Sequence, residues 1–138
     1  MRRALFIPVI VLSLSACQTI PEADNAASIG VNFDFEARHA CKNYGGPFAR
    51  TSPKISLTGV PAGTKHLAFT MVDLDFTSFN HGSETIEYKQ AIIPEGALKT
   101  YIGPCPPRPH RYKITFKALN ADKALVLGKG EATRVWPK

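Results

Sequence analysis

The sequence predicts a mainly β fold with only a few short helical turns, and three observations lead to this prediction. Short apolar stretches either alternate with polar residues or run without interruption, as strands do. Clusters of Gly, Pro, Asn and Asp separate these stretches, which is typical of turns between strands. No segment keeps the period of a helix, so helical turns are expected only near residues 94–99 or 119–124.

The first half of the chain contains three expected strands. Residues 31–35 alternate between apolar and polar side chains and form the first strand. A loop over 40–53, with several Gly and Pro residues, separates it from a short strand over 54–58. After a turn at 59–64, residues 66–72 are apolar nearly throughout, which favours a strand in the middle of the sheet.

The second half contains three more expected strands. Residues 77–84 have the composition of a loop, and residues 85–93 are strand-like. Four prolines make 104–109 a rigid loop, and 111–119 alternates as a strand. The last strand is bent and covers 124–127 and 132–136, with an interruption at Gly128 and Gly130.

The N-terminal segment has the features of a lipoprotein signal. Arg2 and Arg3 precede an apolar run over 5–14, and Leu14-Ser15-Ala16-Cys17 follows it. The run is shorter than the roughly 20 apolar residues that span a bilayer. We therefore expect a signal peptide over 1–16 and acylation of Cys17, for example with palmitate. The alternative is an ordinary cleaved signal with a chance cysteine at that place.

This signal predicts the location and the domain organisation. Residues 17–29 would comprise the lipidated Cys17 and a flexible tether, and residues 30–138 one β domain. Two or three acyl chains hold a protein durably on a bilayer, whereas one does not. We expect a bacterial cell-envelope location, and Gln18 after the lipidated residue favours the outer membrane, facing the periplasm.

Two cysteines remain once Cys17 is acylated, so Cys41 and Cys105 have one possible pairing. Disulfides persist in exported proteins, which favours a bridge between them. The alternative is two buried thiols that never meet.

Charge and motifs exclude several classes of function. The formal net charge is +6, but the basic residues are scattered and form no nucleic-acid motif. The four His residues lack metal-ligand spacing, and no cofactor fingerprint is present. Asp73 and Asp75 are spaced like a glycosidase pair, but a strand end is where Asp commonly caps a turn. We expect no nucleic-acid partner, no metal, no cofactor and no enzyme activity.

Several motifs fall in one order along the chain. They are Asp73-Leu74-Asp75, His81, Gly103-Pro104-Cys105-Pro106-Pro107 and His110-Arg111-Tyr112. This order resembles the phosphatidylethanolamine-binding protein family, in its bacterial Raf-kinase-inhibitor-like branch. The resemblance covers roughly residues 31–136 and implies a compact, mostly antiparallel β fold with a small anion pocket.

The resemblance implies a site formed by Asp73, His81, His110 and Tyr112, with Pro104 as its wall. Elementary chemistry agrees with it, because residues i and i+2 of a strand share a face and so place His110 beside Tyr112. An imidazole and a phenol donate hydrogen bonds to an anion, and Asp73 would orient one imidazole.

Two functions follow as expectations. The first is a lipid-anchored, non-enzymatic binding protein for a small anion or a phosphorylated headgroup. The second is a structural or interaction lipoprotein whose domain binds another envelope protein and whose pocket is vestigial.

Overall fold

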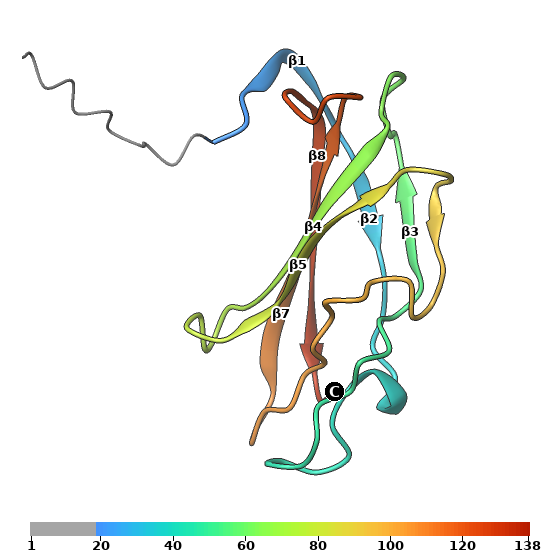
Figure 1. The fold of residues 1–138 in the computed structure, drawn as a ribbon. Helices are drawn as coiled ribbons and strands as arrows, with labels where there is room; N and C mark the ends of the chain where they lie inside the picture. The colour runs from blue at the N-terminus through green and yellow to red at the C-terminus, as the bar shows by residue number, and fades with distance from the viewer. Residues whose placement is uncertain (1–18) are drawn as a thin grey trace, which may run out of the picture.

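The computed structural model describes residues 19–138, so the predicted signal peptide and Cys17 lie outside the described residues. The described chain forms two facing β-sheets (Figure 1). The first has five strands in the order β1-β8-β7-β4-β5, and the second has three in the order β2-β3-β6. The prediction of a mainly β fold is confirmed. The strands are β1 (Glu22–Ser28), β2 (Gly30–Asn32), β3 (Ile55–Thr58), β4 (His66–Asp73), β5 (Asn80–Glu87), β6 (Ile92–Ile93), β7 (His110–Leu119) and β8 (Val126–Trp136).

The core lies between the two sheets and follows from the alternation of the strands. Along β7 the buried positions recur at every second residue, as a strand with one face on the core requires. β4 pairs with β7 along its whole length, from His66 opposite Leu119 to Asp73 opposite Tyr112. The largest fully buried side chains include Leu67, Phe69, Ile114 and Phe116 from the first sheet and Ile55 from the second.

The N-terminal end of the domain differs from the prediction. Residues 22–28, which the sequence assigns to a flexible tether, form β1 and pair in parallel with β8. Close backbone approach makes this pairing possible, because a Cβ on Gly130 would collide with the Ile29 carbonyl oxygen. Gly128 and Gly130 therefore do not interrupt the last strand, and β8 runs continuously from Val126 to Trp136.

Other boundaries also differ. The predicted loop over 77–84 is mostly strand, since β5 already starts at Asn80 and pairs with β4 across a bulge. The strand expected over 85–93 ends at Glu87 and resumes only as the two residues of β6. The first strand is shorter than expected, although Phe33 and Phe35 still pack in the core. Among residues 19–138 the helical structure is one 3₁₀ turn, η1 (Ala37–His39), and not the turns expected at 94–99 or 119–124.

Two properties of the described residues bear on the membrane and on metals. No helix in residues 19–138 has the length and apolar character to cross a bilayer. The same residues hold no group of three or more His, Cys, Asp or Glu side chains arranged to bind a metal ion.

Candidate functional site

A cavity of about 350 Å³ lies at the end of the larger sheet where β4 ends and β7 begins. Four of the five ligand-binding residues predicted from the sequence line it: Asp73, His81, His110 and Tyr112. All four are at most 8% exposed. The remaining walls come from loops that converge on this end of the sheet: Tyr44, Phe48, Asp75, Phe76, Phe79, Cys105, Pro106, Pro107 and Arg108.

Asp73 organises the floor of the cavity. One carboxylate oxygen, Oδ1, accepts hydrogen bonds from the backbone N–H groups of Asp75 and Phe76, at 2.8 and 3.0 Å. The other, Oδ2, lies 2.7 Å from Nδ1 of His110. Because a carboxylate only accepts, Nδ1 of His110 carries the proton in this pair. Asp73 therefore both caps the turn after β4 and leaves Nε2 of His110 as the free ring nitrogen.

His81 is held in the same manner from the other side. Its Nδ1 lies 2.8 Å from the carbonyl oxygen of Ile102, so Nδ1 is again the donor and Nε2 remains free. Burial lowers the pKa of His81 below its ordinary value of 6.5, while the bond to Ile102 and the charge of Asp73 act in the opposite direction. The neutral form of this imidazole is therefore favoured over the protonated form.

Tyr112 lies between the two imidazoles. Its ring meets that of His81 edge to face at a centroid distance of 5.2 Å and that of His110 at 6.4 Å. Burial raises the pKa of Tyr112 well above its ordinary value of 10, and the charge of Asp73 raises it further. The phenol therefore keeps its proton at physiological pH and is a hydrogen-bond donor, with the Asp73 carboxylate as one acceptor.

Asp75 holds the start of β7 in place through hydrogen bonds with Arg111. Its carboxylate accepts from the backbone N–H of Arg111 at 2.7 Å and from Nη2 of the same side chain at 2.9 Å. The Arg111 guanidinium lowers the pKa of Asp75 to about 2. Both acids of the Asp73-Leu74-Asp75 motif are thus engaged in positioning the strand that carries His110.

Pro104 does not line the cavity, which corrects the prediction that it forms the wall. Its ring is fully buried, and its carbonyl accepts a hydrogen bond from the N–H of Cys41 at 2.9 Å. The next two prolines, Pro106 and Pro107, form the wall. The predicted disulfide between Cys41 and Cys105 is confirmed, and it joins this proline loop to the loop that contains Tyr44 and Phe48.

An aromatic rim and a cation, which the sequence did not predict, surround the mouth of the cavity. Tyr44, Phe48 and Phe76 are 71%, 41% and 56% exposed, and Phe48 stacks on Phe79 at 5.2 Å. Arg108 adds a positive charge from the proline loop. The signal available in the sequence was the set of four aromatic residues in otherwise polar loops, where apolar side chains have no core to join.

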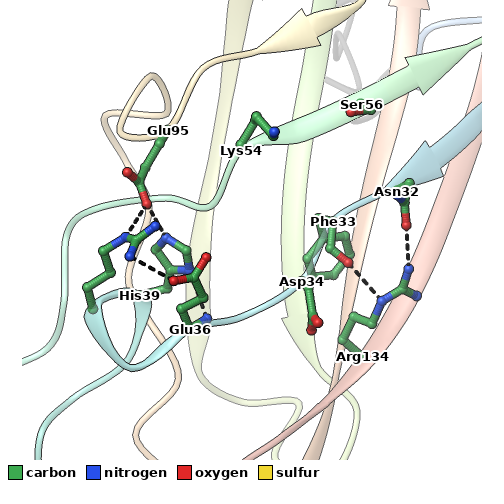
Figure 2. A pocket seen from close by; sticks show the side chains of 10 residues that line it. Asn32, Phe33, Asp34, Glu36, His39, Lys54, Ser56, Glu95 and Arg134 are labelled. Carbon is green, nitrogen blue, oxygen red and sulfur yellow. Dashed lines mark hydrogen bonds and ion pairs between the residues drawn. The ribbon is translucent and has the colours of Figure 1, made fainter.

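A second, larger cavity of about 530 Å³ lies beside η1 and the end of β2 (Figure 2). Several of its charged and polar groups bind one another. Glu95 binds both Arg38 and His39, and Arg134 donates to the Phe33 carbonyl and the Asn32 side chain. His39 is fully engaged, because its Nδ1 accepts from the N–H of Glu36 while Nε2 meets Glu95. This network ties η1 to its neighbours, and we place the functional site at the smaller cavity.

Two solved structures share the fold. YbcL from E. coli, described as a new member of the mammalian phosphatidylethanolamine-binding protein family, has a TM-score of 0.63 and 21% identity, over 80% of this chain and 98% of its own. A putative phosphatidylethanolamine-binding protein homologue from Chlamydia trachomatis has a TM-score of 0.58 and 18% identity, over 83% and 99%. No protein-family model and no curated protein matches the chain. The likeness therefore establishes the fold.

Proposed function

We propose that the chain is a lipid-anchored protein of the bacterial envelope whose β domain binds a small anion or a phosphorylated headgroup without chemical turnover. The observation that carries this proposal is the meeting of two buried imidazoles, each with a free Nε2, beside a phenol in one cavity. Side chains distant in sequence supply these groups, and the backbone and Asp73 fix their orientation.

The charge balance explains how an anion is held. Apart from the imidazoles, the acids Asp73 and Asp75 are matched by the bases Arg108 and Arg111. A free Nε2 accepts a hydrogen bond when the ring is neutral and donates one when the ring is protonated. Binding of an anion at His81 is therefore coupled to protonation of its Nε2. The protonated imidazole then adds one positive charge to the cavity.

The lining supports binding rather than turnover. Cys105 is the one cysteine among the described lining residues, and its sulfur is bonded to Cys41, so it offers no free thiol as a nucleophile. Asp73 and Asp75 are committed to hydrogen bonds that position β7. The prolines and the disulfide give a stiff wall, which reduces the entropy lost when a ligand binds.

The envelope location is supported by the sequence and by the cysteine chemistry. The segment 1–16 and Cys17 have the pattern of a lipoprotein signal. A disulfide in the domain fits an oxidising compartment such as the periplasm.

The direct test is an NMR titration of the ¹⁵N-labelled protein with phosphoethanolamine, with sulfate as a simpler probe. We expect chemical-shift changes at the amides of His110 and Tyr112 that saturate, and loss of these changes in His110→Ala. The matched control is His66→Ala, which alters a partly buried imidazole at the opposite end of β4. A titration without changes at either amide contradicts the proposal.

A second function is favoured by one observation, the exposed aromatic rim of Tyr44, Phe48 and Phe76. Exposed apolar groups gathered at one end of a domain fit contact with another protein. In that case the chain is an interaction lipoprotein with a vestigial pocket. The test is a pull-down from solubilised envelope. This function is supported over the first if a partner protein is recovered with the natural chain and with His110→Ala but not with Phe76→Ser.

A further inference from the structure

We infer that the cavity takes its anion from the aqueous phase and not from the headgroups of the bilayer that holds Cys17, since the chain enters the domain at the end of the sheet remote from the cavity. The inference rests on the proposed function and defines its ligand as a water-soluble anion.

The entry point is fixed by described residues. β1 begins at Glu22, which lies opposite Val126 at the start of β8. The carbonyl oxygen of Pro21 accepts a hydrogen bond from the N–H of Val126 at 2.9 Å. Leu119, the last residue of β7, also lies opposite Val126. From Pro21 onward the chain is therefore attached to the end of the sheet where β7 turns into β8 (Figure 1).

The cavity is at the other end of the same strands. His110 begins β7, and Asp73 ends β4 opposite Tyr112. β7 has ten residues, which at about 3.3 Å per residue span about 30 Å. The entry point and the cavity are separated by most of this length, with β1 and the start of β7 at opposite ends of the molecule in Figure 1.

The covalent chain between Cys17 and the sheet is too short to compensate. The four residues from Gln18 to Pro21 reach at most about 14 Å when fully extended. If the cavity contacted the bilayer, Pro21 at the other end of the sheet would lie about 30 Å above the membrane surface. This height is roughly twice the maximum length of the chain between Cys17 and Pro21. A domain held at Cys17 can stand on the bilayer or lie along it, but its cavity end does not face the headgroups beneath.

The short tether has this effect only because β1 is a strand. Had residues 17–29 been a flexible tether, their extended reach of about 40 Å would have let the cavity turn toward the bilayer. Pairing of residues 22–28 with β8 removes that freedom and sets the orientation of the domain.

The test anchors the chain from Cys17 to Lys138, as signal cleavage would leave it, on vesicles by coupling the Cys17 thiol, the one cysteine outside the disulfide, to a maleimide lipid. One set of vesicles contains phosphatidylcholine alone, and the other contains equal parts of phosphatidylcholine and phosphatidylethanolamine. Binding of radiolabelled, water-soluble phosphoethanolamine is measured by equilibrium dialysis. We expect the same affinity in both sets, within twofold, because the headgroups of the anchoring bilayer do not compete.

A longer linker supplies the matched control. Thirty Gly and Ser residues inserted between Ile20 and Pro21 give the tether an end-to-end distance of about 30 Å and a far longer maximum reach. With this linker we expect phosphatidylethanolamine to reduce the affinity for phosphoethanolamine at least fivefold. The linker variant carrying His110→Ala should not bind the probe in either set.

The outcomes separate the two proposals. Competition by phosphatidylethanolamine with the natural tether, seen as a tenfold or greater loss of affinity, overturns this inference and leaves the anion-binding function standing. Equal affinities with the long linker as well overturn the argument from tether length. Absence of probe binding on phosphatidylcholine vesicles overturns the proposed function and this inference together.

Discussion

The affinity of the cavity for a doubly charged anion should rise as the solution is acidified. Sulfate is a suitable probe because its charge does not change between pH 8 and pH 5.5. Burial lowers the pKa of His81 below 6.5 and favours its neutral form, although the hydrogen bond from its Nδ1–H to the Ile102 carbonyl oxygen acts in the opposite direction. For Nε2 to donate to sulfate, the ring must take up one proton.

The magnitude follows from this proton balance. Between the pKa of His81 in the free protein and its higher pKa in the complex, uptake of one proton with each anion changes the affinity tenfold per pH unit, which is about 1.4 kcal/mol of binding free energy. From pH 8 to pH 7 the dissociation constant should therefore fall about tenfold. The stability of the domain without ligand should change in the opposite direction to the affinity. Because His81 binds a proton more readily in the unfolded chain, its contribution to the free energy of unfolding falls as the pH drops below 6.5.

Isothermal titration calorimetry in buffers of different ionisation enthalpy measures both the affinity and the proton uptake. His81→Gln keeps a hydrogen-bond donor that does not titrate, and it should give a flat profile. His66→Gln, at the far end of β4, should keep the slope. An affinity that is constant from pH 8 to pH 6, or that weakens in acid, would refute the assignment of His81 as the protonated donor.

Two further predictions concern the scaffold of the cavity. Removing the disulfide with Cys41→Ser and Cys105→Ser should lower the free energy of unfolding by about 4 kcal/mol in the chain-entropy model, because the two cysteines are separated by 64 positions. Urea denaturation measures this loss, and a loss below about 1 kcal/mol would contradict the prediction. Gly82→Ala should cost about 2 kcal/mol or more, because φ is +119° and the new Cβ would lie 2.6 Å from the Thr100 carbonyl oxygen. Gly45→Ala is its control, since φ is +76° but the space is open, and a larger loss there than at Gly82 would overturn the explanation.

The residues at the base of the cavity were predicted from the family resemblance, and strand periodicity supported one part of that prediction. Asp73 and Tyr112 are register partners, a pairing that the sequence did not predict because it indicated the two strands but not their register. His110 shares a face with Tyr112 because it is two residues away in the same strand. His81 entered by resemblance alone, since a loop was expected where β5 begins.

The wall was not predictable in the same way. Which proline of the 104–109 loop faces the cavity depends on the path of that loop, and this path is set by contacts across the chain. The bond from Cys41 to the Pro104 carbonyl and the adjacent disulfide turn Pro104 inward and leave Pro106 and Pro107 at the surface of the cavity. Local sequence holds no information about such long-range constraints.

β1 shows a different limit of sequence reasoning. Its residues are small or polar and give no strand signal, because the strand contributes mainly backbone hydrogen bonds to the edge of β8. The evidence for it lies elsewhere in the chain, in Gly128 and Gly130, where the absence of a side chain admits the neighbouring backbone. These glycines indicated an interrupted strand when β8 was considered alone, and they indicate a partner once the sheet is considered whole.

The contrast between the two cavities is the strongest argument for anion binding over a vestigial pocket. In the larger cavity both nitrogens of His39 have partners, and Glu95 pairs with both Arg38 and His39. In the smaller one, His81 and His110 are nearly as buried, yet each commits Nδ1 to the protein and leaves Nε2 toward a cavity of about 350 Å³. No buried side-chain nitrogen or oxygen of the described residues lacks a hydrogen-bond partner, so these two Nε2 atoms are accessible to solvent and available to a ligand. A domain that needed only a rigid scaffold would gain stability by filling this space with apolar side chains, so the open Nε2 atoms favour the proposed anion binding over a vestigial pocket.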